Sequence, residues 1–302
     1  MAEWSSRVQN ALAALPRSPA GADAPAAAGL SGPEWTLLVY CFLSEPPFTL
    51  DELRLWLPYT SLALIEQWFK EILATLNVQR VTGGEFIVTD KGANLVKDWC
   101  RRGRGLLAQQ HPLPEAALRK LATALEQVVT AALEKPTAKT VRLAGSRRLA
   151  FEPLASSMAR IDQALTDLYH FRDDCHSAAW SAAGLDGPEA EVLTLLWRRE
   201  VRDVHSLAAL LGEPRGLDAE QVARTAQRLA SKALVSIEGD QAEVTAAGRA
   251  LREGIEAATD RHYMPPWTVL PPPQLQALGE LLTQFTRALS RDRQAESLPH
   301  SE

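Results

Sequence analysis

The sequence contains no apolar run long enough to cross a membrane. No stretch approaches the roughly 18 uninterrupted apolar residues of a spanning helix. The first ten residues, MAEWSSRVQN, include an acidic side chain and lack the apolar segment of a signal peptide. We therefore expect a cytoplasmic protein that neither spans a membrane nor is exported.

Cysteine is scarce, and motifs for catalysis are missing. The three cysteines, Cys41, Cys100 and Cys175, are odd in number and lack the spacing of a metal site, which fits reduced thiols. The sequence has no phosphate-binding glycine loop, no Gly-x-Ser-x-Gly, no Cys-x-x-Cys and no catalytic-triad order. These absences predict a protein that is not an enzyme and holds no metal or cofactor.

Strand-forming residues are also sparse, whereas Ala, Leu, Glu and Arg are abundant. This composition predicts a mainly α-helical fold. A chain of 302 residues that is 46% hydrophobic can bury two cores of ordinary size. Two domains are therefore the natural expectation.

An internal repeat indicates where these domains lie. The segment AAGLSGPEW at 27–35 returns as AAGLDGPEA at 182–190, and each copy leads into an amphipathic helix with proline in its first turn. Two further helices and a short hairpin with a glycine turn follow in both halves. The predicted ranges are 32–45, 49–57, 61–77 and 78–92, and then 187–200, 203–211, 218–234 and 235–248.

Three helices followed by a hairpin is the order of a winged helix. We predict two winged helices in tandem, produced by duplication and packed as a pseudo-dimer through flanking helices. The first domain is 1–150, with an Ala- and Pro-rich loop at 16–26, a winged helix at 32–99, a trailing helix and a basic connector. The second domain is 151–302, with its winged helix at 187–257 between flanking helices.

The second hairpin carries a family resemblance. The segment EVTAAGRALREGIE (243–256) resembles MarR-type regulators, in which the second wing strand runs into Thr-x-x-Gly-Arg-x-Leu. The second half is also similar to a group of bacterial helix-turn-helix proteins with MarR-like domains. MarR proteins are homodimers that bind palindromic DNA through two winged helices, so the resemblance implies such a dimer fused into one chain.

The wings depart from the MarR pattern. MarR wings carry an Asp-x-Arg sequence whose arginine enters the minor groove, whereas the second wing here, SIEGDQAEVT (236–245), has three acidic residues and no arginine. The first wing keeps Arg80 near its base, but Glu85 follows its Gly-Gly turn. These sequences argue against minor-groove reading by both wings.

The third helix of a winged helix enters the major groove, so its outer face should be polar. In 218–234 the apolar residues recur at helical spacing. The opposite face predicts base contacts from Gln221, Arg224, Thr225, Arg228 and Lys232. The alternative is an ordinary solvated face in which arginine is present for its helix propensity.

The corresponding helix of the first half, 61–77, has a different character. Its apolar residues cover more than one side, and its charged residues sum to −1. A helix of this kind is buried or lies at an interface, because a solvated helix has one polar face. We predict a packing or protein-partner surface that includes Trp68 and Phe69.

Positive charge is concentrated in residues 101–148. The chain has a net charge of −5, but this segment holds ten basic and three acidic residues. The segment is either a solvated, partly flexible connector or a DNA-backbone contact. The second interpretation predicts phosphate contacts from Arg101, Arg102, Arg104, Lys139, Arg142, Arg147 and Arg148.

The segment YHFRDDCHSAAW (169–180) combines histidines and carboxylates at helical spacing. His170 with Asp174 and Asp173 with His176 each share a helix face, but no third ligand is recognisable, so structural pairs are favoured over a metal site. Where the outer helices meet the winged helix, the position of MarR-type effectors, the sequence instead favours a small-molecule pocket. Its predicted lining is Tyr169, His176, Trp180, Trp197, Tyr263 and Trp267.

Together these patterns predict a DNA-binding regulator, of transcription, that binds double-stranded DNA and responds to a small-molecule effector. The alternative is a non-enzymatic interaction module, because tandem winged helices also serve as protein-binding subunits of chromosome-organising complexes. The acidic wings and the apolar helix at 61–77 favour that alternative. The basic segment and the 218–234 face favour DNA.

Overall fold

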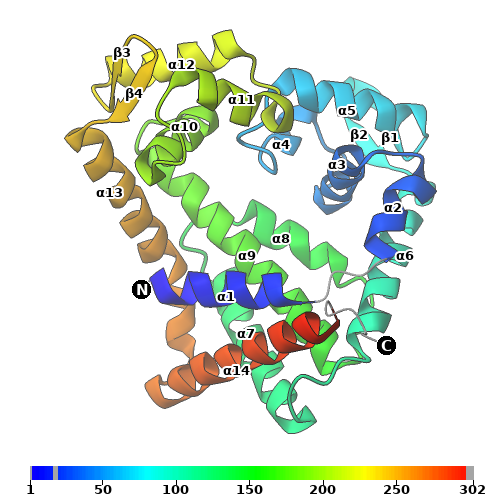
Figure 1. Cartoon of the computed structure of the whole chain (residues 1–302). Coiled ribbons are helices and arrows are strands. Elements are labelled where there is room, and N and C mark those ends of the chain that lie inside the picture. Colours follow the sequence, from blue (N-terminus) through cyan, green and yellow to red (C-terminus); the bar gives the residue numbers. More distant parts are fainter. Residues whose placement is uncertain (1, 16–19, 297–302) are drawn as a thin grey trace, which may run out of the picture.

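The computed structural model describes residues 2–15 and 20–296 and confirms a mainly helical protein. Figure 1 shows two groups of short helices, each with a small hairpin, at the top of the molecule, and longer outer helices below them. We call residues 32–99 the first head and residues 187–257 the second head. Within the described ranges, no helix has the length and apolar character that a membrane span requires.

The first head contains three helices and a hairpin, followed by a long helix. These elements are α3 (Gly32–Leu43), α4 (Leu50–Leu53), α5 (Leu62–Ala74), β1 (Val78–Arg80), the 3₁₀ turn η1 (Thr82–Gly84), β2 (Phe86–Val88) and α6 (Asp90–Leu107). The strands pair antiparallel, with Val78 opposite Val88. Ile65, Phe69 and Ile72 of α5 are buried in the core of this head.

The second head has the same order of elements. They are α10 (Gly187–Arg198), α11 (Val204–Arg215), α12 (Ala219–Ser231), β3 (Val235–Glu238), β4 (Gln241–Val244) and α13 (Ala246–Tyr263). Val235 lies opposite Val244 in the hairpin. In both heads, a residue just ahead of the second helix forms an isolated β-bridge to the hairpin. Phe48 pairs with Phe86, and Asp203 pairs with Gln241.

Both heads start with the same local backbone device. Ser31 with Glu34, and Asp186 with Glu189, have the capping-box arrangement at the start of α3 and α10. In both, the glutamate side chain accepts the N–H of the cap residue, and Asp186 also accepts the Glu189 N–H. Each box directly follows a glycine with positive φ that closes a turn, Gly29 or Gly184. This shared geometry explains the recurrence of the AAGLxGPE segment.

The hairpins also join the following helices in the same way. The hydroxyls of Thr89 and Thr245 cap α6 and α13, and each also donates to a carbonyl at the end of the preceding helical segment. Gly92 and Gly248 lie so close to that segment that an added Cβ would be 2.3 Å from the Asn77 oxygen or 2.0 Å from the Leu234 oxygen. Only glycine fits these positions without displacement.

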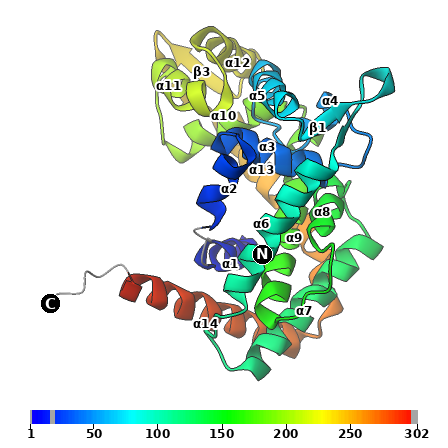
Figure 2. The ribbon, with the colours of Figure 1, turned by 90° about the vertical axis from the view of Figure 1, so that its right-hand side faces the viewer.

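The outer helices of both halves share one central core. It combines side chains from α1 (Ala2–Ala14), α7 (Glu115–Glu134), α8 (Val141–Ser146), α9 (Ser157–Ala182), the 3₁₀ turn η3 (Pro265–Val269) and α14 (Pro272–Glu296), with contributions from α6 and α13. Each head has a separate core of its own. Figure 2 shows the outer helices crossing beneath the heads.

Two segments differ from the sequence expectations. The predicted loop at 16–26 lies partly outside the described residues, at 16–19, and the remainder belongs to a helix, α2 (Ala20–Ala28). Its alanines favour a helix, and Ala24 and Ala28 are buried against the first head. Residues 101–148 form the end of α6, all of α7 and α8, so they are folded elements rather than a connector.

Candidate nucleic-acid interface

The two heads touch directly. The Ser61 N–H, at the start of α5, donates to the Arg215 carbonyl at the end of α11 with an N–O distance of 2.8 Å. A Cβ added to Gly187 would lie 1.8 Å from the Pro58 oxygen, and one added to Gly216 would lie 2.6 Å from Leu64 Cβ. We call this contact the seam; it lies where α5 and α11 meet in Figure 1.

Side chains reinforce the seam. The Arg215 guanidinium binds the Glu191 carboxylate with N–O distances of 2.8 to 3.2 Å and lies 5.8 Å from the ring centre of Tyr59. Arg215 and Glu191 belong to the second head, whereas Tyr59 belongs to the first. The seam therefore combines a backbone hydrogen bond, close glycine contacts and a stacked cation.

The seam limits the distance between α5 and α12, the third helix of each head. Asp218, the cap of α12, lies three residues after Arg215, and Ser61 caps α5. The Cα atoms of Ser61 and Asp218 therefore cannot be more than about 18 Å apart. Helix-turn-helix dimers place their reading helices about 34–36 Å apart, in successive major grooves. The N-terminal ends of α5 and α12 are too close for that arrangement.

The face of α12 agrees in part with the sequence analysis. Val222, Ala226 and Leu229 are buried, Arg224 is exposed and Gln221 is half-buried. Thr225 is only 3% exposed, and its hydroxyl donates to the Gln221 carbonyl at 2.9 Å. The expected base contact from Thr225 does not fit this position, because the side chain points into the head.

Two further cations of α12 are held by carboxylates at the start of α10. Lys232 Nζ lies 2.8 Å from Glu189 Oε2, and Arg228 binds both Glu189, at 3.2 Å, and Asp186, at 2.9 Å. The Glu189 side chain is 4% exposed. Burial alone would raise the pKa of Glu189, but hydrogen bonds from Lys232, the Asp186 backbone and Arg228 together lower it.

Arg224 is paired as well. Its guanidinium binds Glu220, one turn earlier on the same exposed face. A surface pair of this kind contributes little free energy, so Arg224 can exchange Glu220 for another anion at small cost. Arg224 is therefore the most available cation of α12, whereas Arg228 and Lys232 must first leave a buried carboxylate.

The hairpins add negative charge beside α12. Glu238, Asp240 and Glu243 are all exposed on β3, its turn and β4. In the first head, the Arg80 guanidinium lies 5.2 Å from the ring centre of Phe86 on the paired strand. Both hairpins therefore lack an extended, free cation for a minor groove.

The basic residues of 101–148 fall into two groups. Arg101 binds Asp98 at 2.7 Å and Glu152 at 3.2 Å, Arg104 donates to the Leu149 carbonyl at 2.6 Å, and Arg147 binds the buried carboxylate of Asp167 at 2.6 Å. Among the described residues, no hydrogen bond or ion pair engages the side chains of Arg102, Lys139 and Arg148.

Arg142 does not fit its predicted role. Its side chain is 7% exposed and donates to Asp174 Oδ1 at 3.3 Å and Ser177 Oγ at 3.0 Å. The Asp174 carboxylate also accepts the backbone N–H groups of Arg142 and Leu143, at 3.1 and 3.0 Å. Asp174 thereby caps α8 from α9, and Arg142 is buried by this contact rather than free for phosphate.

The residues of the predicted small-molecule pocket do not gather. Tyr263 and Trp267 are fully buried in the central core, whereas Trp180 packs against the core of the second head. His176 Nδ1 lies 3.1 Å from Thr259 Oγ1 between α9 and α13. Trp197 lies beneath the Arg252 guanidinium, and Tyr169 on α9 is 37% exposed.

The histidines of α9 serve packing in this structure. His170 meets the Trp56 ring edge-on at 5.4 Å, and burial, followed by the nearby Arg142, lowers the pKa of His170 to about 4. Burial likewise lowers the pKa of His176 to about 4. No group of three or more His, Cys, Asp or Glu residues among 2–15 and 20–296 is arranged to hold a metal ion.

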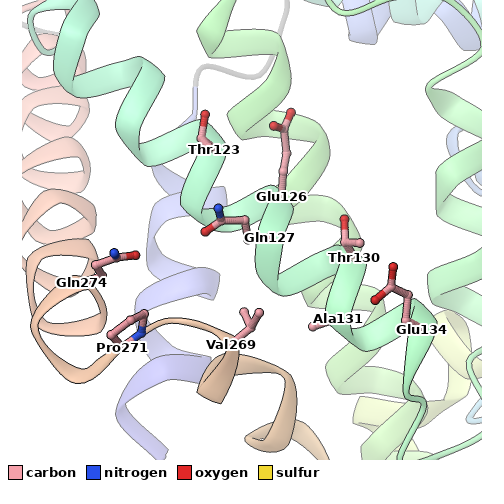
Figure 3. Close-up of a pocket in the computed structure, with 9 residues that line it drawn as sticks. All are labelled: Thr123, Glu126, Gln127, Thr130, Ala131, Glu134, Val269, Pro271 and Gln274. Atoms are coloured by element: carbon pink, nitrogen blue, oxygen red, sulfur yellow. The ribbon is translucent and has the colours of Figure 1, made fainter.

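Among the residues that the structure describes, two grooves lie away from α5 and α12. The larger, of about 530 Å³, runs between α7 and the η3–α14 segment, and Figure 3 shows Glu126, Gln127 and Glu134 along one side and Gln274 across from them. Its Glu126 is already engaged by Arg160. The second groove, of about 480 Å³, lies between the first head and α8.

The chain belongs to a helix-turn-helix family, whose model matches residues 96–296. The match covers α7 to α14 and therefore the whole second head and most outer helices, whereas α3, α4, α5 and the first hairpin precede it. Family membership suggests a DNA-binding role. The comparisons with curated proteins and with solved structures give no match.

Proposed function

We propose that this protein is a DNA-binding regulator of transcription that contacts one site on the duplex through α12. In this proposal the two heads are duplicated, MarR-like winged helices, and only the second retains a reading helix. The shared capping boxes, threonine caps and close glycines support duplication. The family match over the second head supports DNA as the partner.

The seam is the observation that carries the one-site proposal. A fused MarR-like dimer would need its reading helices one helical turn of DNA apart, about 34–36 Å. The Ser61–Arg215 hydrogen bond keeps the ends of α5 and α12 within about 18 Å. One head can enter a major groove while the other lies outside it.

The first head is unsuited to the groove. The exposed side chains of α5 have a net negative charge, which DNA phosphates do not favour; they include Leu62, Ala63, Glu66, Gln67, Lys70 and Glu71. Helix α12 exposes Arg224, Gln227 and Arg228, the types of side chain that read base edges. We assign Arg224 and Gln221 to base contacts and the unpaired Arg102 to a phosphate contact.

Fluorescence anisotropy over a salt series tests this proposal. On a duplex obtained by selection, Arg224→Ala should cost about 1–3 kcal/mol and abolish the preference over a scrambled duplex. Arg119→Ala is the matched control, because Arg119 is an exposed arginine on α7, which lies at the far end of the molecule from α12 (Figure 1). Wild-type binding no tighter than about 10⁻⁴ M on every duplex would reject the proposal.

A protein-interaction module is the second candidate. Every cation of α12 assigned to DNA is ion-paired and the hairpins are acidic. On α5, Leu62 is 37% exposed and Trp68 is half-buried. These features suit a protein partner bound at α5. Loss of all DNA binding, together with partner binding that Leu62→Asp abolishes and Leu133→Asp on α7 does not, would favour this candidate.

A further inference from the structure

The groove between the first head and α8 is built by a close approach of the two elements. A Cβ added to Gly145 of α8 would lie 2.5 Å from the Trp56 ring and 2.7 Å from the Leu43 oxygen. Glycine therefore lets α8 touch the first head at one point, and the groove opens beside that point. The contact gives the groove a fixed wall on each side.

Charges of opposite sign face this groove from its two walls. Lys139 and Arg148 come from the α8 side, before the helix and in the 3₁₀ turn η2 (Arg147–Leu149), whereas Glu45 and Glu52 come from the first head. None of these four groups forms an ion pair with another, although all line one groove. Glu52 uses one oxygen, Oε2, to cap α4 at Thr49, and no hydrogen bond or ion pair to another described residue engages the Glu45 side chain.

The rest of the lining is mostly apolar, with Ser44 and Thr140 as its other polar side chains. Leu55 is 39% exposed there, and Trp56, which is 6% exposed, lies beside Val141 and Ala144 in the same lining. Small-molecule sites have volumes of about 300–1,000 Å³, with an apolar lining and a few placed polar groups. The groove, at about 480 Å³, has this size and this composition.

We propose that this groove binds a small zwitterionic organic molecule with an apolar body. The anionic end would lie against Lys139 or Arg148, the cationic end against Glu45 or Glu52, and the body on Trp56. An anion alone would meet two carboxylates, and a cation alone would meet two bases, so only a ligand carrying both charges satisfies each wall. The inference goes beyond the DNA contact proposed above and does not depend on it.

The same charges argue that Lys139 and Arg148 do not hold DNA. A phosphate backbone following these two residues would pass the carboxylates of Glu45 and Glu52 across the groove. Repulsion between like charges disfavours that path. The unpaired Arg102 on α6 is outside the groove and remains the phosphate contact in the proposed function.

Peptide probes test the site directly. The tripeptide Leu-Leu-Leu carries both terminal charges, its N-acetyl form keeps only the anion, and its C-terminal amide keeps only the cation. Each is titrated into the full chain while the indole N–H signal of Trp56, assigned with Trp56→Phe, is followed by NMR. The tripeptide should bind with a Kd of roughly 1–10 mM and the two blocked forms should bind two- to fivefold more weakly, as exposed ion pairs suggest.

Charge variants of the chain show where the two charged ends of the bound tripeptide lie. Arg148→Gln and Lys139→Gln should weaken the tripeptide and its acetyl form two- to fivefold but leave the amide unchanged, and Glu45→Gln should weaken the tripeptide and the amide only. Arg102→Gln, which removes an arginine outside the groove, is the control for this titration and should leave the affinities of all three probes unchanged. An unperturbed indole spectrum before titration shows that each variant is folded.

Several outcomes would overturn the proposal. The first is no shift of the Trp56 signal at about 20 mM probe, where at least about two-thirds of the sites should be occupied. The others are equal affinity for the three probes, and groove variants that behave like Arg102→Gln. None of these measurements includes DNA, so failure here leaves the one-site DNA proposal standing, and loss of DNA binding leaves this proposal standing.

Discussion

At the residue scale, the Glu189 side chain makes two kinds of contact that the sequence alone does not connect. Its side chain closes the capping box of α10 and also holds Lys232 and Arg228 of α12. The spacing in α12 correctly predicts which face carries Arg228 and Lys232, but not their partner, because that partner is on a different helix. The i, i+4 spacing of Arg228 and Lys232 was the available signal for a shared anion.

Replacing Glu189 should release those two cations. Glu189→Gln keeps the capping box, since glutamine also serves there, but removes the charge that binds Lys232 and Arg228. We expect tighter DNA binding and a slope of log K against log salt that is steeper by up to about 1.8, because two more phosphate contacts become available. Glu34→Gln, at the same place in the first head, is the control. Equal slopes for both variants would contradict this mechanism.

Asp173 provides a pH-dependent test at the same scale. Burial raises the pKa of Asp173 to about 6, despite Arg142 and Arg172, so the folded state holds a proton that the unfolded state releases near pH 4. Folding therefore loses stability as pH rises from about 4 to 6. Asp173→Asn stays neutral and should gain about 1–3 kcal/mol over wild type at pH 7 but little at pH 4.

Urea denaturation of both proteins at the two pH values checks the Asp173 prediction. Asp51→Asn, at an 85% exposed side chain, serves as the control and should show the same difference from wild type at both pH values. A gain for Asp173→Asn that is independent of pH would show that ionisation of this carboxyl is not its cause.

At the element scale, the spacing of apolar residues and the residue types that start helices predict most helices well. Helices α3, α5, α10 and α12 begin at or within one or two residues of the predicted starts, because Gly-Pro and Ser or Asp caps mark them. The sequence predicts a loop where α2 forms, because Pro25 interrupts a short alanine run, whereas in the structure Ala24 and Ala28 of this helix pack on the first head. Arg142 was misassigned for a similar reason: its burial depends on Asp174 of α9.

Gly248 tests the junction between the second hairpin and α13. Gly248→Ala should destabilise the protein by at least about 2 kcal/mol, since the new Cβ would lie 2.0 Å from the Leu234 oxygen and backbone must move. Gly254→Ala, later in the same helix with open space around it, should stabilise by about 0.5–1 kcal/mol. Thermal denaturation measures both, and similar effects would disprove the close contact.

At the scale of the whole molecule, the heads were predictable but the seam between them was not. The Gly-Pro step that starts α3 and the one that starts α10 look the same in sequence. In the structure Gly32 has open space around it, whereas Gly187 faces the Pro58 oxygen. The asymmetry arises from how the heads pack, and that packing depends on the central core formed by the outer helices.

These two glycines provide a matched test of the seam. Gly187→Ala should separate the heads locally and expose the Ser61 N–H, which donates to the Arg215 carbonyl in the wild type. Amide hydrogen exchange at Ser61 should accelerate at least tenfold, corresponding to about 1.4 kcal/mol of lost protection. Gly32→Ala should leave that rate unchanged; acceleration in both variants, or in neither, would contradict the seam contact.

Hydroxyl-radical footprinting on a selected duplex tests the one-site proposal most directly. Because the seam keeps the N-terminal ends of α5 and α12 within about 18 Å, the wild-type chain should protect a single segment around one major groove. Protection in that segment should disappear with Arg224→Ala and persist with Arg119→Ala. Two protected segments centred about 10 base pairs apart, each lost only when its own head is altered, would contradict the proposal.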